Sequence, residues 1–386
     1  MILYISIACY LFVLVFLYDF GNNKKGKNVA FRISFILLWL YSGLRYRVGT
    51  DSFMYETIFD YLPPITKLST TDFLLFYDIE PLWIILNSLI KTVWNNFVAL
   101  ELFCAFVLNY SFFNFVKKHT NYQFTAILIY FLIDYLILNC EYMRQATAVA
   151  LYMAFVCPLY EQKKYIVWFL GTLILCFMHN TMYICFFIPI IDRLNFSNQK
   201  AIYYWIACFI IISNIDVFKI LAGLSVGVSS TSYKIEAYSR ETRATIYNIN
   251  FLISKLYVIF LLIYLFGLKI EFKYKNIIIL YGFSIVLTSV HGIFYRFQFV
   301  VSFYYLLFYA CCIADTLLYK KQQIKAIIIF VATILPTATT LMHRYDNGLY
   351  NYQKYFPYYS YFNPRKDKHR EKLKAYDEFE KMLDRR

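Results

Sequence analysis

Residues 97–116 read FVALELFCAFVLNYSFFNFV, and Lys117 and Lys118 follow them directly. About 20 mainly apolar residues in a helix span the hydrocarbon core of a bilayer, and lysines mark the cytoplasmic end of such a helix. Similar apolar runs recur along the chain. They predict twelve membrane-spanning helices, near 2–20, 29–43, 97–116, 122–138, 145–158, 165–178, 181–191, 201–218, 251–267, 276–290, 297–316 and 326–342.

The composition predicts an all-α, polytopic membrane protein. Of the 386 residues, 60% are apolar and 16% charged, and the mean hydropathy is +0.51. Soluble globular proteins carry about 45–50% apolar and about 25% charged residues. We predict one transmembrane domain over residues 1–362, with outer loops 44–78 and 219–250, and a charged C-terminal tail over 363–386. A soluble enzyme with an appended anchor is excluded, because the apolar runs leave no chain for a second domain.

The motifs of several common binding sites are missing. The sequence contains no GxGxxG or GxxxxGK[ST] loop for nucleotides, and no D-x-D pair for a metal-bound nucleotide sugar. Its nine cysteines include no CxxC pair and lie mostly in apolar runs, which is typical of small buried hydrophobic residues. We therefore expect no metal and no cofactor.

Lys and Arg divide the connections between the helices into two alternating sets. The connections 21–28, 117–121, 159–165, 192–200, 268–276 and 319–325 hold 15 basic residues, 14 of them Lys. The connections 44–78, 139–144, 178–181, 219–250, 290–297 and 343–362 hold 11, seven of them Arg. Positive charge marks the cytoplasmic side of a membrane protein. The first set of connections is therefore predicted inside the cell, and the second set and the N-terminus are predicted outside. Because Arg grips phosphate or carboxylate with two hydrogen bonds, the outer set predicts a site for an anionic ligand.

One further apolar segment decides on which side of the membrane the later connections lie. Residues 79–93, IEPLWIILNSLIKTV, could form a helix, but a full crossing there would place Lys117 and every later basic connection outside. We interpret the segment as a re-entrant or interfacial helix that is entered through Glu80 and Pro81.

The densest motif of the outer set is GLRYRVGTD at 43–51. Arg45, Arg47 and Asp51 are costly at membrane depth without a partner, and Gly49 permits a turn that could aim them into one cavity. The two arginines are candidates for binding an anion, and Asp51 is the first candidate for a general base. A salt-bridged helix terminus is the alternative.

Three further candidates precede or open the helix near 145–158. Glu141, Arg144 and Gln145 lie at its outer end, and small residues follow them, as in closely packed helices. Arg144 either lines an aqueous cavity or pairs with Glu141.

The remaining candidates lie in later outer connections. His179 is either a hydrogen-bonded structural residue or a proton acceptor or phosphate contact. His291, Arg296 and Arg344 mark other helix breaks. Tyr358 lies in a tyrosine-rich stretch that either belongs to an interfacial aromatic belt or stacks on sugar rings.

Taken in order, these residues resemble the EpsG family of Wzy-type polysaccharide polymerases. The resemblance rests on GLRYRVGTD with Tyr55, Glu80-Pro81-Leu82, Arg144-Gln145 with Ala148, His179, Tyr295-Arg296, and Pro357-Tyr358. It covers nearly the whole chain, apart from the 219–250 loop and the tail.

The resemblance implies a GT-C-like fold and glycosyl transfer on the outer face of a bacterial plasma (inner) membrane. The donor would be a growing glycan on undecaprenyl pyrophosphate, and the acceptor a sugar hydroxyl of another lipid-linked repeat unit. The product would be a surface polysaccharide, such as an exopolysaccharide, capsule or O-antigen. The implied partners are undecaprenyl-pyrophosphate-linked glycans, membrane lipids, a chain-length regulator and a flippase, with no nucleic acid. Such a donor carries its own leaving group, in agreement with the missing nucleotide and metal motifs.

The predicted site combines this resemblance with the charges of the outer set. The predicted catalytic residues are Arg47, Asp51, Arg144 and His179, and Glu80, Glu141 and His179 are rivals of Asp51 as the base. The predicted substrate-binding residues are Arg45, Glu80, Glu141, Gln145, His291, Arg296, Arg344 and Tyr358.

Two other functions stay open at this point. A lipid-linked glycan ligase or sugar acyltransferase would also place Arg and His at outer helix ends, but it would transfer single units. A secondary transporter predicts charges near the bilayer midplane and an internal repeat, and the sequence shows no such repeat.

Overall fold

The chain is mainly helical in the part that the structure describes. The computed structural model describes residues 1–21, 23–193, 203–208, 249–268, 270–290, 294–344, 350–365 and 367. Those ranges contain no β-strand, and three of their helices are long and apolar enough to cross a membrane: Ile2–Phe20, Phe97–His119 and Gln323–Leu341. The predicted all-α fold of a membrane protein is confirmed at this level.

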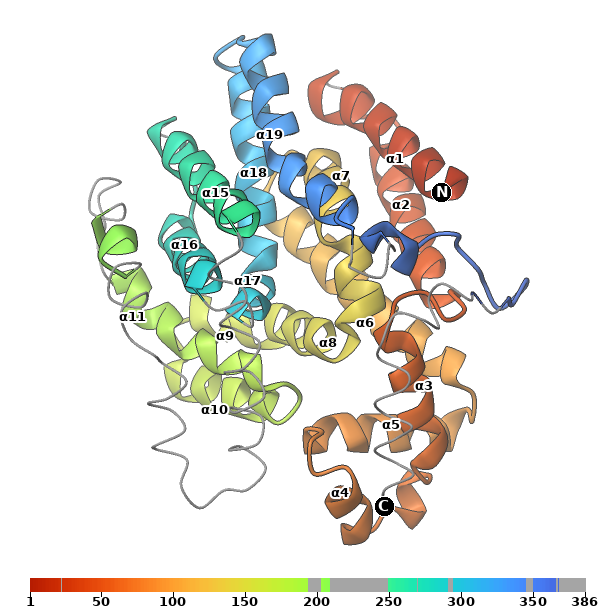
Figure 1. Ribbon diagram of the computed structural model, residues 1–386. Helices are drawn as coiled ribbons and strands as arrows, with labels where there is room; N and C mark the ends of the chain where they lie inside the picture. Colours follow the sequence, from red (N-terminus) through yellow and green to blue (C-terminus); the bar gives the residue numbers. More distant parts are fainter. Residues whose placement is uncertain are drawn as a thin grey trace. The chain divides into compact units, whose positions relative to one another are not determined.

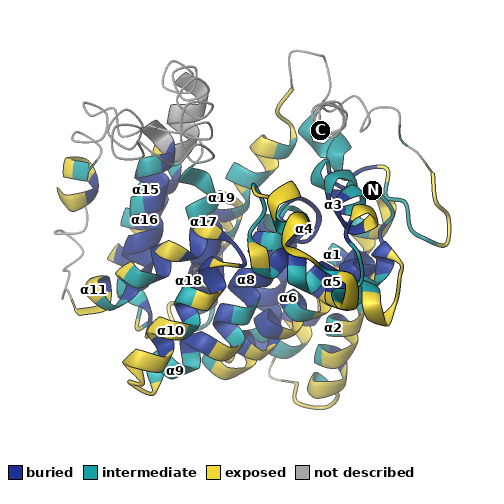
Figure 2. Ribbon diagram, turned by 90° about the horizontal axis from the view of Figure 1, so that it is seen from below, coloured by how far each residue is buried: buried dark blue, intermediate teal, exposed yellow. Residues whose placement is uncertain are grey.

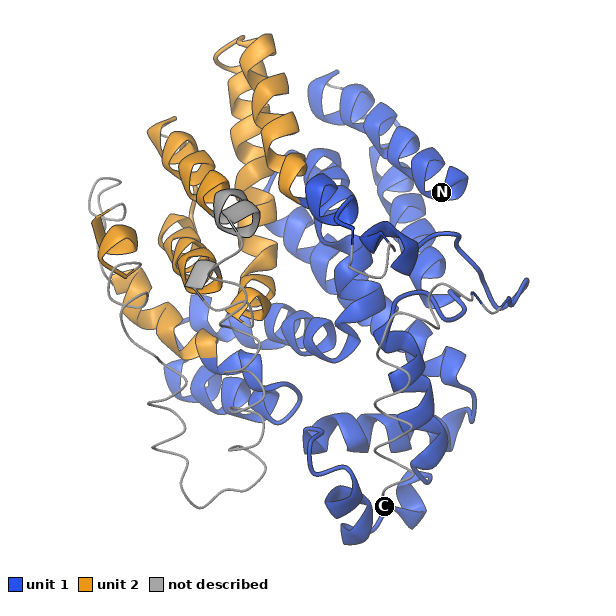
Figure 3. Ribbon diagram, viewed as in Figure 1, with its two compact units in different colours: residues 1–183, 337–386 blue, residues 184–336 orange. Residues whose placement is uncertain are grey.

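The chain forms two compact units. Unit 1 comprises residues 1–183 and 337–386, and unit 2 comprises residues 184–336 (Figure 3). The predicted loop 219–250, most of the predicted helix near 201–218 and most of the predicted tail lie outside the described residues.

The helices of unit 1 from α1 to α10 follow one another along the chain, and η7 returns to the unit after unit 2 (Figures 1 and 3). They are α1 (Ile2–Leu14), η1 (Val15–Phe20), α2 (Lys27–Gly43), α3 (Asp51–Tyr61), η2 (Ile65–Lys67), α4 (Thr70–Leu75), α5 (Pro81–Val93), α6 (Phe97–His119), α7 (Gln123–Ile133), η3 (Ile137–Glu141), α8 (Met143–Leu151), η4 (Tyr152–Val156), α9 (Cys157–Glu161), α10 (Tyr165–Cys176) and η7 (Asn351–Lys354). The segments η1, η3 and η4 are π-helical.

The helix α6 is the centre of unit 1. It begins at Asn96, whose side chain accepts the backbone N–H of Val98 and caps the helix. The elements α2, α5, α7, α8 and η4 pack around it, and most of its side chains are buried (Figure 2). Its buried Asn109 is hydrogen-bonded to Asn139 and Tyr130, since a polar side chain between membrane helices needs a partner there.

Connections predicted to share a side of the membrane lie together in unit 1. The Lys27 ammonium lies 3.5 Å from Asp19 and donates to the backbone oxygen of Asn121. The Lys118 ammonium lies 2.6 Å from Glu161. Contacts therefore join the predicted cytoplasmic connections 21–28, 117–121 and 159–165 in two pairs.

The connection 44–78 was predicted as an outer loop, but it contains α3 and α4. These two helices and α5 share a small apolar core of Ile58, Leu62, Phe76 and Ile84, and Figure 1 shows the three helices gathered at one end of the unit. The segment is mixed in polarity, so the apolar runs used to find spanning helices do not reveal short helices that bury only one face.

The C-terminal end of α5 lies against α3. Near its C-terminus, Lys91 donates to the backbone oxygens of Phe59 and Asp60 at the end of α3. α6 then starts next to the other end of α3, where Ser52 Oγ lies 3.4 Å from a carboxylate oxygen of Glu101. The predicted helix near 79–93 is thus present, and its C-terminal end and the start of α6 lie against opposite ends of α3.

Unit 2 is a second helical cluster, built around α16 (Lys275–Val290). The helices α11 (Ile188–Arg193), α15 (Ile249–Gly267), α17 (Tyr295–Val300) and α18 (Ser302–Leu318) pack against it. The 3-10 segment η5 (Asn180–Phe187) leads into the unit, and α19 (Gln323–Leu341) leads out of it, with Pro336 inside the helix at the boundary.

Candidate functional site

The loop that follows α2 takes its shape from Gly49. This glycine has a φ of 93°, and a Cβ on it would lie 2.4 Å from the backbone oxygen of Cys140. Its N–H donates to the backbone oxygen of Lys354. Only glycine combines that φ with so close an approach of another backbone, so the predicted tight turn is present and is pressed against η3.

Glu141 fastens this loop to η3. Its two carboxylate oxygens accept the backbone N–H of Thr50 at 3.0 Å and the Thr50 hydroxyl at 2.6 Å. The hydroxyl of Tyr55 donates to its backbone oxygen, and the residue is buried. Glu141 was predicted to bind substrate and was a rival for the base, but here both of its oxygens organise the loop.

Arg47 lies over two aromatic rings and pairs with a carboxylate. Its Nε donates to Glu56 at 2.7 Å, and the guanidinium carbon lies 4.6 Å from the ring centre of Phe53 and 5.5 Å from that of Tyr46. The arginine side chain is 27% exposed, and that of Glu56 is 18% exposed. The guanidinium is thus oriented by its neighbours and still reaches the surface, as a residue that meets a ligand must.

Arg144 is paired with Glu80, a residue 64 positions earlier in the chain. Their charged atoms are 2.7 Å apart, and the side chains are 16% and 12% exposed. The second carboxylate oxygen of Glu80 accepts the backbone N–H of Asn180 at 3.4 Å. The N–H of Leu82 donates to the backbone oxygen of Phe177. The start of α5, the start of α8 and the end of α10 therefore meet at this ion pair.

His179 is buried next to that meeting point. Its Nδ1 accepts the backbone N–H of Thr181 at 3.3 Å and lies 2.8 Å from the Thr181 hydroxyl. A ring nitrogen that accepts an N–H carries no proton, so the neutral ring holds its proton on Nε2. This tautomer suits a phosphate contact better than a proton acceptor.

Arg45 is directed inward, away from the surface. It is 1% exposed, its Nη2 lies 3.2 Å from the buried carboxylate of Glu101, and its Nη1 donates to the backbone oxygen of Ser42. Its Nη2 also lies 3.5 Å from the sulfur of Met143. Arg45 was predicted to bind substrate, and in this structure it joins α2 to α6.

A late segment of the chain covers the loop. The N–H of Tyr46 donates to the backbone oxygen of Tyr359, and the N–H of Tyr361 donates to that of Leu44. Tyr358 stacks on Tyr41 and donates its hydroxyl to the backbone oxygen of Tyr41 at 2.8 Å. We call residues 356–361 the strap.

Burial raises the pKa of the Tyr358 and Tyr361 phenols in the strap. The charged phenolate is the form that burial disfavours, so both hydroxyl groups stay protonated and act as hydrogen-bond donors at neutral pH.

The other predicted site residues lie in several different elements of the two units. Asp51 is half-buried at the first position of α3, and Gln145 is buried in α8. Arg344 lies over the ring of Tyr350 at 5.8 Å. Arg296 is in α17 of unit 2, and His291 lies outside the described residues.

Two carboxylates of this region, Glu56 and Glu101, were not predicted. Glu101 had a visible signal, since it is a charge within an apolar run and such charges need a partner. Glu56 had none, because its pairing with Arg47 depends on where α3 begins.

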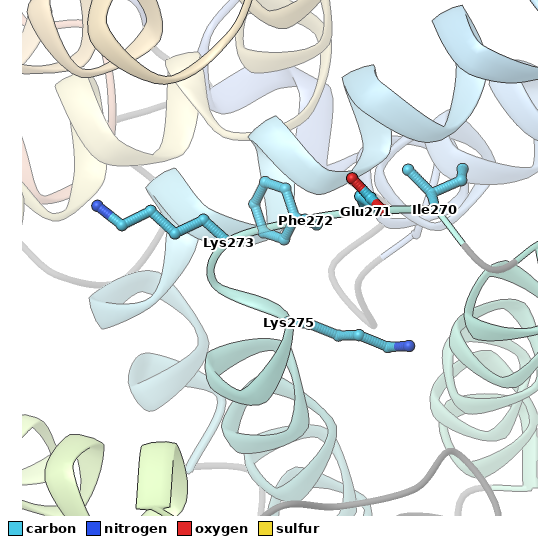
Figure 4. A pocket seen from close by; sticks show the side chains of 5 residues that line it. All are labelled: Ile270, Glu271, Phe272, Lys273 and Lys275. Atoms are coloured by element: carbon cyan, nitrogen blue, oxygen red, sulfur yellow. The ribbon is translucent and has the colours of Figure 1, made fainter.

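A cavity of about 620 Å³ lies elsewhere, in unit 2, in the predicted cytoplasmic connection 268–276. Glu271, Lys273 and Lys275 are among its lining residues, and the two lysine side chains point in opposite directions (Figure 4). The lysine ammonium groups lie over the rings of Tyr274 and Phe266. None of the predicted site residues lines this cavity.

One of the comparisons with known proteins identifies a family for the chain. The sequence model of the EpsG family matches residues 28–360, which is most of the chain. No curated protein matches the chain, and no solved structure matches it. The matched range includes the loop after α2, the Glu80–Arg144 pair, His179 and the strap as far as Ser360. The chain therefore belongs to the EpsG family, a family of Wzy-type polysaccharide polymerases.

Proposed function

We propose that this protein joins undecaprenyl-pyrophosphate-linked repeat units into a surface polysaccharide on the outer face of the bacterial plasma membrane. Membership of the EpsG family supports a polysaccharide polymerase that acts on lipid-linked glycans. The apolar helices support a location in the membrane.

One observation carries the site assignment. Two arginines that reach the surface, Arg47 and Arg144, are each held by a carboxylate at 2.7 Å. The hydrogen bonds between Thr50 and Glu141 join the segments that contain them. Three segments far apart in the sequence, namely 47–56, the start of α5 at Glu80 and 141–144, are thereby joined in unit 1.

The proposed reaction uses these arginines to stabilise the leaving group. The bond between the anomeric carbon of the donor glycan and a pyrophosphate oxygen breaks, and the acceptor hydroxyl forms the new glycosidic bond. Arg47 and Arg144 bind the pyrophosphate oxygens, on which negative charge increases as the bond breaks. Their charge serves the purpose that a metal ion serves in other transferases, so we propose a metal-independent transfer.

Asp51 is the proposed general base that takes the proton of the acceptor hydroxyl. The geometry supports this choice indirectly, because both Glu141 oxygens bind Thr50 and Glu80 is held against Arg144. His179, with its proton on Nε2, is proposed to contact the pyrophosphate. We keep Gln145, His291, Arg296, Arg344 and Tyr358 as proposed contacts of the two lipid-linked substrates.

Arg45 takes a different proposed role. Its burial and its pairing with Glu101 support a positioning residue that sets the path of the chain toward Arg47.

We also propose twelve crossings, a GT-C-like arrangement and an outward-facing site. The support is that the C-terminal end of α5 lies beside the end of α3, and we propose that α5 does not carry the chain across the membrane. Substrates assembled inside then need a flippase, and a chain-length regulator is a further proposed partner.

The decisive experiment uses the purified protein in liposomes that contain lipid-linked repeat units. The expected product is a ladder of repeat lengths, and Arg144→Ala should collapse it to single units. A single transferred unit in the wild-type reaction would instead indicate a ligase, and an acylated sugar would indicate an acyltransferase.

A further inference from the structure

The carboxylate of Glu56 in α3 uses only one of its two oxygens in the contact with Arg47. Its Oε2 accepts the hydrogen of the Arg47 Nε at 2.7 Å. Its Oε1 has no hydrogen-bond partner among the described residues, and this oxygen is not buried. The side chain is 18% exposed. Because an ionised carboxylate offers about four acceptor positions on its two oxygens, most of its capacity is open to a ligand.

The charge of Glu56 restricts what this ligand can be. An ionised carboxylate only accepts hydrogen bonds, and it repels other anions, so the group that faces Oε1 is a hydrogen-bond donor and not a phosphate oxygen. Arg47 and Glu56 together are neutral, whereas a site for an anion alone is served best by cations. The pair therefore suits a ligand that carries a donor close to its anionic group.

A sugar phosphate is such a ligand. In the lipid-linked donor, the first sugar is bonded directly to an oxygen of the pyrophosphate. A pyrophosphate in contact with the Arg47 guanidinium therefore places the hydroxyl groups of that sugar beside the carboxylate that contacts the same guanidinium. Bare undecaprenyl pyrophosphate, the lipid that the proposed transfer releases, lacks these hydroxyl groups.

The aromatic rings around the pair also suit a sugar. The ring centres of Phe53 and Tyr46 lie 4.6 Å and 5.5 Å from the guanidinium carbon of Arg47, and Tyr46 meets the ring of Tyr361 in the strap edge-on at 5.5 Å. All three aromatic residues are partly exposed. Ligand sites combine aromatic side chains with a few placed polar groups, and the C–H faces of sugar rings pack on such rings.

We propose that Glu56 accepts a hydrogen bond from the sugar that is bonded to the pyrophosphate of the donor, and thereby distinguishes the glycan-bearing donor from bare undecaprenyl pyrophosphate. The proposal rests on the proposed function, from which it takes the identity of the lipid. When the sugar is transferred to the acceptor, Oε1 loses its donor and faces the pyrophosphate of the product. Glu56 therefore strengthens the binding of the donor and weakens the binding of the product, which favours release of the product.

The test compares the affinities of two lipids for the purified protein in liposomes. One is radiolabelled undecaprenyl pyrophosphate, and the other is the same lipid carrying one repeat unit, extracted from cells in which the gene for this protein is deleted. Competition between them is measured on ice, and the wild type should bind the lipid with the repeat unit more tightly. Glu56→Gln keeps an oxygen for the Arg47 Nε hydrogen and removes the charge.

Glu56→Gln should weaken the binding of the lipid with the repeat unit by about tenfold, as expected for a hydrogen bond to a charged group. Its affinity for the bare lipid should stay equal or rise, because a repulsion is removed. Equal weakening for both lipids would show that Glu56 only orients Arg47 and would overturn the proposal. Unchanged affinities, or a wild type that binds both lipids equally, would overturn it as well.

The chain offers a matched control for this substitution. Glu161 is also paired with a cation, Lys118 at 2.6 Å, and its side chain is 13% exposed, but it lies in a predicted cytoplasmic connection. Glu161→Gln should leave both affinities unchanged. Size-exclusion chromatography checks that each variant is folded. If Glu56→Gln is not, Glu56→Asp keeps the charge, withdraws the carboxylate by one carbon–carbon bond, and should weaken the lipid with the repeat unit more than the bare lipid.

The same liposomes separate this proposal from the proposed function. A wild-type ladder of repeat lengths, together with unchanged affinities in Glu56→Gln, would reject the sugar contact and keep the polymerase. A preference for the lipid with the repeat unit that is lost in Glu56→Gln, without any ladder from the wild type, would keep the sugar contact and reject the polymerase.

Discussion

At the scale of single residues, the arginines of this site differ in exposure and therefore in what they can do. Arg47 and Arg144 are partly exposed and each is oriented by a carboxylate, whereas Arg45 is buried against Glu101. The sequence predicted Arg47 and Arg144 as catalytic and Arg45 as substrate-binding, because all three are cations near outer helix ends. The structure separates two proposed ligand contacts from one residue that holds the fold.

The shape of the guanidinium should matter at Arg144. We expect Arg144→Lys to lower polymer synthesis by about 10²-fold, close to the loss in Arg144→Ala, because an ammonium group cannot make two parallel bonds to a phosphate. The measurement is the length distribution of the polysaccharide in cells with equal amounts of membrane-inserted protein. Arg32→Lys, at an exposed position of α2, is the control and should leave the lengths unchanged. Wild-type lengths in Arg144→Lys would reject the bidentate contact.

The buried pair of Arg45 and Glu101 should show a non-additive effect on stability. Removing one partner leaves a buried charge uncompensated, which costs about 3–5 kcal/mol. We expect Arg45→Met alone to lower the unfolding temperature strongly, and Arg45→Met with Glu101→Leu to lower it less. Thermal unfolding of the detergent-solubilised variants measures both effects. A double variant less stable than either single variant would contradict this account.

Gly49 should tolerate no side chain. In Gly49→Ala the new Cβ meets the backbone oxygen of Cys140 at 2.4 Å, and φ is 93°. A clash with backbone cannot be relieved by a side-chain rotation, so we expect loss of polymer and a reduced protein level. Gly267→Ala is the matched control, because a Cβ there meets nothing within 4 Å. The measurements are the protein level and the polymer length in the two variants. A Gly49→Ala variant with wild-type protein level and polymer length would show that the loop can move.

At the scale of elements, the segment from α3 to α5 is the part of the chain whose helices the apolar runs of the sequence predict least well. Its helices bury their apolar faces against one another in a core that includes Ile58, Phe76 and Ile84. α5 has 13 residues, which gives a length of about 20 Å, shorter than the hydrocarbon core of a bilayer, which is about 30 Å thick. The contacts of its C-terminal end with α3 support the proposal that α5 returns the chain to the side on which it began.

Side-specific labelling tests the topology of α5. Single cysteines at Leu74, before α5, and at Val93, at its end, replace side chains that are 73% and 90% exposed. In a background without the native cysteines, we expect an impermeant maleimide to label both in intact cells. A cysteine at Lys118, whose side chain is 55% exposed, should react only after permeabilisation. Labelling of Leu74→Cys and Val93→Cys from opposite sides would show that α5 crosses the membrane.

At the scale of the whole molecule, the two ends of unit 1 are joined across the sequence. The strap bonds to Leu44 and Tyr46 more than 300 residues earlier, and the match to the EpsG family ends at residue 360, within the strap. From both observations we expect the strap, and not the charged tail, to be needed for function.

Truncation should distinguish the strap from the tail. Deletion of residues 366–386 should leave polymer length unchanged, because the bonds from Tyr359 and Tyr361 to the loop are kept. Deletion of residues 356–386 removes those bonds and should abolish the polymer. Polysaccharide sizing in cells with equal protein levels makes the comparison, and loss of polymer in the shorter deletion would give the tail a function.

The sequence by itself determined the all-helical membrane fold, the positions of most helices and the family, because hydrophobic runs and ordered motifs are local properties of the chain. It also singled out Arg47, Arg144 and Gly49. The tertiary structure alone decided which charges meet: Arg144 with Glu80, Arg47 with Glu56, Arg45 with Glu101, and Glu141 with Thr50. Spacing cannot predict such pairs, since their strength depends on burial and on distances between segments that only packing brings together.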